Sequence, residues 1–145
     1  PKMITGNEKI NSDLLICCVD NNNGRLAAQR LSDENETPLI ITGNENWEPM
    51  AWLYLPEYKY TYNNPYKRWD LGNLKEGRQE TCSGIKVIDE NPQLPEANYC
   101  AGAHALTILY SIKTCMKERN YVAEVISTPW SQTKTIKEIT LNNEK

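Results

Sequence analysis

The stretch that decides the fold is DLLICCVDNNNGR, residues 13–25. Its centre, residues 14–19, is an unbroken run of six apolar residues. Such a run, without alternating polar residues, is typical of a strand buried on both faces, as in the parallel sheets of α/β proteins. In these sheets ligands bind just beyond the carboxyl ends of the strands, which is where Asp20 and Asn21 come. The stretch therefore predicts a buried parallel strand with a polar site at its end.

A helix and two further strands are predicted next. An asparagine turn and Gly24 lead into a helix that extends to about Glu34, with a narrow apolar stripe. A second apolar run, residues 39–41, is closed by Thr-Gly-Asn. Strand, helix and strand with short connections predict a βαβ unit with a right-handed crossover. Residues 50–55 predict a third strand, which follows a short loop and is expected to pair antiparallel at the edge of the sheet.

The second half of the chain is less regular. Residues 57–93 lack strong periodicity, with at most a brief strand at 85–88, and irregular segments of this length tend to be functional or disordered. A long helix is predicted over 95–117, because small and apolar residues recur there at helical spacing. Strands are expected at 121–126 and, on a sheet edge, at 135–141. The chain as a whole predicts one α/β domain, with a mixed parallel and antiparallel sheet and two main helices.

Composition excludes several classes of protein. The length of 145 residues suffices for one domain with a substantial core. A net charge of −3 gives no electrostatic footprint for nucleic acid or an anionic membrane, and no apolar run approaches the roughly 18–20 residues that span a bilayer. Five cysteines without a C-x-x-C pair indicate reduced thiols rather than a disulfide framework or a zinc site. We therefore expect a cytoplasmic protein that binds neither nucleic acid, membrane nor zinc.

Asp20 and Arg25 are candidate site residues at the end of the first strand. A carboxylate there suits a hard cation such as Mg²⁺, although Asp after a strand is more often a turn or capping residue. Arg25 lies one turn into the predicted helix. From there it either reaches toward an anionic group or extends into solvent, and arginine as a residue type favours solvent.

Cys82 is a candidate nucleophile. It lies in the irregular segment, so we expect it to be accessible, and accessible thiols react when their thiolate is stabilised. No histidine is near it in the sequence, so an inert surface thiol fits equally well. The other four cysteines fall in predicted strands and helices, where we expect burial: Cys17, Cys18, Cys100 and Cys115.

His104 is the only histidine of the chain and lies within the long predicted helix. We expect it to be packed and hydrogen-bonded rather than catalytic. A single imidazole weakens schemes based on Ser-His-Asp, Cys-His or histidine metal ligands. The glycine-rich phosphate loops G-x-G-x-x-G and G-x-x-x-x-G-K are also absent from the sequence. The residues alone thus define no complete catalytic centre.

Taken in order, several segments resemble the C-terminal half of the ThiF/MoeB/E1-like family. They are SDLLICCVDNNNGRLAAQRL, TPLIITGNENWEPMAWLYLP, the irregular segment with ETCSG, and NPQLPEANYCAGAHALTILYSI, followed by closing strands that contain STPW. The resemblance covers about residues 10–130. It implies a Rossmann-like, three-layer domain of which residues 1–145 form the second half. Members of this family use Mg-ATP to adenylate the C-terminus of a ubiquitin-like or sulfur-carrier protein.

The resemblance also implies roles for individual residues. Asp20 corresponds to the acidic residue near Mg²⁺ and the ATP phosphates, and Asn21 and Arg25 support that site. Cys82 lies in the crossover region, where many members carry a thioester or persulfide cysteine. The family's paired C-x-x-C zinc motifs are absent, so no zinc is implied.

The largest departure from the family is at the beginning of the chain. The nucleotide-binding residues of the family precede the D-N strand, whereas about a dozen residues precede Leu14 here. We therefore expect a fragment, one half of a split enzyme or a degenerate relative, which is not competent for adenylation alone. Its expected partners are the carrier protein and either the missing N-terminal half or a second copy, paired along an exposed strand edge. The alternatives are a non-catalytic ThiF-like interaction or dimerisation module and, less well supported, a piece of another nucleotide-binding Rossmann protein.

Overall fold

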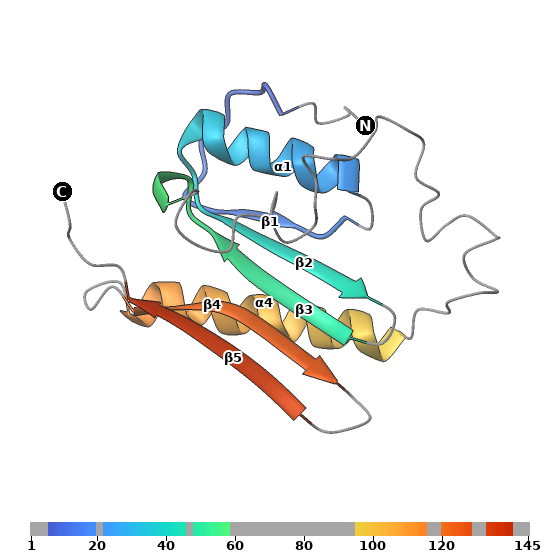
Figure 1. The fold of residues 1–145 in the computed structure, drawn as a ribbon. Coiled ribbons are helices and arrows are strands. Elements are labelled where there is room, and N and C mark those ends of the chain that lie inside the picture. The colour runs from blue at the N-terminus through green and yellow to red at the C-terminus, as the bar shows by residue number, and fades with distance from the viewer. Residues whose placement is uncertain are drawn as a thin grey trace, which may run out of the picture.

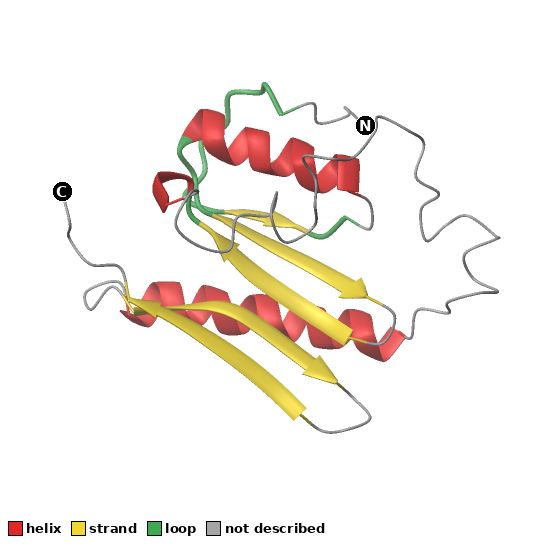
Figure 2. Cartoon of the chain, viewed as in Figure 1, coloured by secondary structure: helices red, strands yellow, loops and turns green. Residues whose placement is uncertain are grey.

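The chain is described by a computed structural model over residues 6–19, 22–45, 48–58, 95–115, 120–128 and 133–140. These residues form one five-stranded sheet with a helix on each face (Figure 1). The strands lie in the sheet in chain order, from β1 to β5. Figure 2 shows the resulting layers, helix, sheet and helix. The predicted α/β class, with a mixed sheet and two main helices, is confirmed.

The first part of the chain forms the predicted βαβ unit. Strand β1 (Leu15–Cys17) pairs parallel with β2 (Leu39–Glu45), and helix α1 (Asn22–Asn35) connects them. The helix ends where Glu36 adopts a left-handed backbone conformation, with φ of 50°. This conformation lets the N–H of Thr37 bond to the carbonyl of Ser32 at 3.0 Å, which satisfies a carbonyl group in the last turn of the helix.

The remaining strands are all antiparallel. Strand β3 (Glu48–Tyr54) pairs with β2 as predicted, and the short 3₁₀ helix η1 (Pro56–Tyr58) follows it. The expectation that this strand lies at the edge is wrong, because β4 (Asn120–Thr128) pairs with its other side. Strand β5 (Thr133–Thr140) then forms the edge, as predicted. β3 is therefore the middle strand, and a pairing distant in sequence puts it there.

Helix α4 (Pro95–Cys115) begins where the sequence predicted and packs against β2, β3 and β4. On its side of the sheet the buried core consists of Ile40, Ala51, Leu53, Leu55, Ala105, Ile108 and Val125. The opposite side, which carries α1, has a second core of Cys17, Leu39, Ile41, Met50, Trp52 and Tyr54. The period of two in a strand sends neighbouring residues to opposite cores, so β2 and β3 are buried on both faces.

Strand β1 is an edge strand, and the prediction that residues 14–19 are buried on both faces is wrong. Of its three residues only Cys17 is buried, whereas Ile16 is 51% exposed. Val19, just beyond the strand, is 36% exposed. α1 covers the Cys17 side, but α4 packs over β2, β3 and β4. An apolar run thus follows an edge that no described element covers.

Candidate functional site

The carboxyl ends of the two parallel strands and the amino ends of both helices meet at one end of the domain (Figure 1). The end of β2 is joined to the first turn of α4 by a contact between the side-chain amides of Asn44 and Asn98. On the other side, the hydroxyl of Thr42 donates to the carbonyl of Cys17 at 3.3 Å. Helix amino ends carry a partial positive charge, so this end of the sheet favours anionic ligands.

Arg25 lies at this end and is buried. It is only 6% exposed, so the expectation of a solvent-exposed arginine is wrong. Its charge acts on Cys17: burial raises the pKa of that thiol, and the Val19 backbone hydrogen bond and the Arg25 charge oppose the rise without cancelling it. Arg25 therefore places its positive charge near the carboxyl end of β1, inside the domain. A buried cation in a low-dielectric setting interacts strongly with any anion beside it.

The buried face of α1 is polar beyond Arg25 as well. Gln29 is 2% exposed and Ser32 is fully buried. Together with Arg25 they are spaced by four and three positions, so the three residues share one face of the helix. The Gln29 amide donates to Asp33 Oδ2 at 3.0 Å and to the Tyr54 hydroxyl at 3.3 Å, and that hydroxyl donates to Asp33 Oδ1 at 2.7 Å. Sequence reasoning missed this row, although its residue types and their spacing were there to be read.

A second polar pair lies on the same side of the sheet. Glu124 is opposite Trp52 in the register of β3 and β4, and its side chain is 1% exposed. The indole N–H of Trp52 donates to Glu124 Oε1 at 2.6 Å. A buried carboxylate is costly unless it is hydrogen-bonded. In the sequence this buried carboxyl group is indicated by a single glutamate within the otherwise apolar run 121–126.

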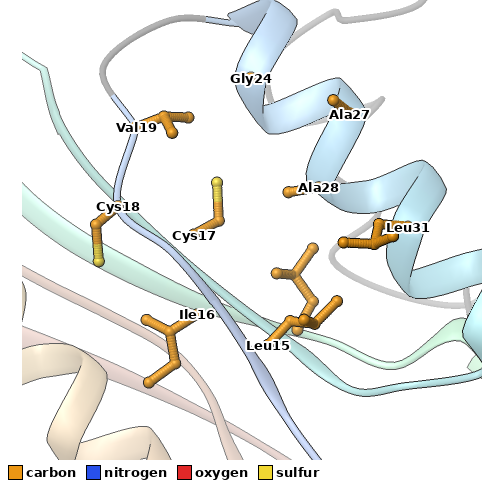
Figure 3. A pocket seen from close by; sticks show the side chains of 10 residues that line it. Leu15, Ile16, Cys17, Cys18, Val19, Gly24, Ala27, Ala28 and Leu31 are labelled. Carbon is orange, nitrogen blue, oxygen red and sulfur yellow. The ribbon is translucent and has the colours of Figure 1, made fainter. Parts of the chain in front are cut away.

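An open apolar groove runs beside β1, with a cavity volume of about 390 Å³ (Figure 3). It lies between the strand and the first half of α1. Its lining residues are Leu15, Ile16, Cys17, Cys18, Val19, Gly24, Ala27, Ala28, Leu31 and Leu39. In Figure 3 the Cys17 thiol points toward α1, whereas Cys18 and Ile16 point away from it. The groove continues the exposed apolar edge of β1 around onto the α1 side.

Of the four predicted site residues, the structure describes one. Arg25 is at the strand end, whereas Asp20, Asn21 and Cys82 lie outside the described residues. Within the part of the chain that is described, no three His, Cys, Asp or Glu side chains come together as a metal site.

The cysteine and histidine predictions have mixed outcomes. Cys17 is buried as expected. Cys18 is exposed, because it follows an edge strand, and Cys100 is half-buried, because it lies between the sheet-facing and the outward face of α4. The side chain of Cys115 lies outside the described set. His104 is 6% exposed, and its Nε2 lies 2.8 Å from the Ser127 hydroxyl. The expectation of a packed, hydrogen-bonded histidine is confirmed.

Comparison with known proteins adds little. No protein-family model matches the sequence, and no curated protein matches it. Among solved structures, the crystal structure of selenomethionine PaaA aligns at a TM-score of 0.41 with 13% identity, over 87% of this chain and 41% of that one. The chain thus spans less than half of that protein's length, and similarity this weak supports no conclusion about function. Among the described helices, none has the length and apolar character needed to cross a membrane.

Proposed function

We propose that this chain is the second part of an adenylating enzyme of the ThiF/MoeB/E1-like type, acting on the C-terminus of a ubiquitin-like or sulfur-carrier protein. The observation that carries the proposal is the buried charge of Arg25 beside Cys17, at the carboxyl end of β1. In the sequence Asp20 and Asn21 lie between that strand and α1. A cation, a strand end and a helix amino end together suit a nucleotide phosphate.

The order of the elements supports the same proposal. The resemblance leads one to expect a parallel strand pair, an antiparallel third strand, a long helix and a closing strand pair. The chain has a parallel β1–β2 pair, antiparallel β3, α4 and the β4–β5 pair in that order. This order is a property of topology and does not by itself specify chemistry.

Arg25 has a clear role in the proposed reaction. A carboxylate oxygen of the carrier attacks the α-phosphorus of ATP as the bond to the β-phosphate oxygen breaks, which gives an acyl adenylate and pyrophosphate. Negative charge shifts onto phosphate oxygens during this exchange. A fixed guanidinium in a buried setting stabilises that charge without reorganisation of solvent. Its planar fork also matches phosphate geometry, which a lysine does not.

Magnesium and the acyl acceptor rest on the resemblance alone. The described residues supply no ligand set for Mg²⁺. Asp20 is the proposed ligand. Cys82 is proposed to take the activated acyl group, with AMP as the leaving group. Both residues lie outside the described part of the chain.

The groove beside β1 is the proposed contact with the rest of the enzyme. Its lining is apolar, and among the described strands β1 pairs with β2 alone, while Ile16 is 51% exposed. Exposed apolar edges favour pairing with another strand. We propose that the segment carrying the missing nucleotide-binding residues adds a strand there and covers the groove.

ATP–pyrophosphate exchange tests this function. The chain is assayed alone, and together with a protein that supplies the nucleotide-binding half, in the presence of the carrier. We expect exchange only in the combined sample, and loss of most of it in Arg25→Met and Arg25→Lys. Arg30→Ala is the matched control, because Arg30 lies on the same helix but is exposed.

Thermal melting of each variant separates loss of function from loss of fold. Absence of exchange in the combined sample contradicts the enzyme proposal. If the combined sample still binds a partner without binding Mg-ATP in a calorimetric titration, the chain is instead a non-catalytic interaction module.

A further inference from the structure

The outward face of α4 carries an exposed apolar row. Tyr99 is 81% exposed, Leu106 63% and Tyr110 69%, and Ala103 between them is also exposed. These four residues, called here the α4 stripe, are spaced by three or four positions and so share one face of the helix. The opposite face of α4 is buried against the sheet, along which the helix runs (Figure 1). α4 is therefore apolar on two opposite sides, a pattern typical of a helix covered on both.

The spacing of residues in the stripe, four, three and four positions, is the same from either end. Tyrosines stand at its two ends, and Ala103 and Leu106 stand between them at equal distances from the midpoint of the stripe. Two copies of α4 packed antiparallel about a twofold axis at that midpoint bring Tyr99 against the partner's Tyr110. They also bring Ala103 against the partner's Leu106, so a large side chain meets a small one. A twofold interface requires this self-complementarity, because one patch must bind its own copy.

The charges on α4 agree with the antiparallel arrangement. Glu96 in the first turn and Lys113 in the last are both exposed, and they too are equally far from the midpoint of the stripe. Antiparallel packing places each Glu96 near the partner's Lys113, twice per dimer. A parallel pair would place like charges together and align the helix dipoles unfavourably. Charge complementarity thus favours a second copy of this chain, in one orientation.

We propose that the protein forms a twofold dimer through the α4 stripe, with the two α4 helices antiparallel. The space beside Gly102 is open, and Ala103 is small, so the helix backbones can approach closely in the middle of the contact. A 21-residue helix is about 30 Å long, so one helix pair buries less than a standard interface. The dimer is accordingly a reversible one, with a dissociation constant of about 1–100 µM.

Sedimentation velocity from about 0.5 to 400 µM tests the proposal, because this range brackets the expected constant. We expect a monomer–dimer equilibrium for the unmodified chain. Leu106→Asp should weaken it at least about a hundredfold, because a carboxylate is placed in the middle of the contact. Leu106 is exposed in the monomer, so the variant should keep its melting temperature. Ile136→Asp is the matched control, because Ile136 is 46% exposed on β5, whereas α4 packs against β2, β3 and β4. It should leave the equilibrium unchanged.

Charge reversal tests the orientation. Glu96→Lys and Lys113→Glu should each raise the dissociation constant about five- to tenfold, and the double variant should return it to within about twofold of the original. A chain that stays monomeric throughout the range overturns the proposal, as does a Leu106→Asp variant that still dimerises. A dimer in which the double charge reversal fails to restore affinity overturns the antiparallel arrangement.

Discussion

The indole N–H of Trp52 donates a hydrogen bond to Oε1 of Glu124 at 2.6 Å, between two adjacent strands and away from solvent. The two residues are directly paired in the β3–β4 register, although 72 positions separate them in the chain. A buried polar group that loses its partner costs more than the hydrogen bond itself contributes. This pair therefore ties the βαβ half of the sheet to its antiparallel half.

Removal of the indole donor should destabilise the protein markedly. We expect Trp52→Phe to cost about 2–4 kcal/mol in urea unfolding, because it removes a buried hydrogen bond and part of a buried ring. The comparison is the double variant with Glu124→Gln, in which both partners of the hydrogen bond are changed. If the two changes are simply additive, the hydrogen bond does not couple the strands.

The hydroxyl of Tyr54 should stabilise α1 on the sheet. Tyr54→Phe removes the hydroxyl that contacts both Gln29 and Asp33, so we expect a loss of about 1–2 kcal/mol and faster amide exchange in α1. Tyr110→Phe is the control, because that ring is 69% exposed. Equal effects of the two substitutions contradict the assigned role.

Glu36 should be improved by glycine. Its φ of 50° is a conformation that costs a residue with a Cβ about 1 kcal/mol, whereas glycine adopts it freely. We expect Glu36→Gly to stabilise the chain by about 0.5–1 kcal/mol in chemical denaturation. Glu34→Gly, two residues earlier and inside α1, should instead destabilise it by about 1 kcal/mol.

Cys17 should make stability fall at high pH. Burial raises the pKa of its thiol above the usual 9.0, so the folded state holds the proton more tightly than the unfolded chain does. The stabilisation is complete below pH 9 and is lost as pH rises from there through the folded-state pKa. Urea midpoints at about pH 7, 9 and 10 should therefore decline less in Cys17→Ala than in the unmodified chain. Cys18→Ala, at an exposed thiol, should follow the unmodified profile.

The sequence predicts local features of this fold well and distant ones poorly. α1 and α4 lie close to their predicted limits, because caps, proline and helical spacing are local signals. The edge position of β1 was not predicted, because an apolar run does not show whether another strand or helix covers it. The burial of Arg25 and Glu124 was missed for the same reason: their surroundings come from other elements. Their burial was indicated in the sequence only by polar residues at helical spacing in α1 and by a single glutamate in β4.

The exposed edge of β1 leads to the last prediction. Ile16→Asp places a charge on an apolar edge that is 51% exposed, so the chain alone should keep its unfolding free energy to within about 0.5 kcal/mol. If a nucleotide-binding half adds a strand there, as proposed, the same change should abolish its association with this chain in a pull-down of the two purified proteins, because the charge is then buried. Ile136→Asp, at the opposite edge strand, should leave that association intact. Association that survives Ile16→Asp would mean that the nucleotide-binding half binds elsewhere, and the groove beside β1 would lose its proposed role.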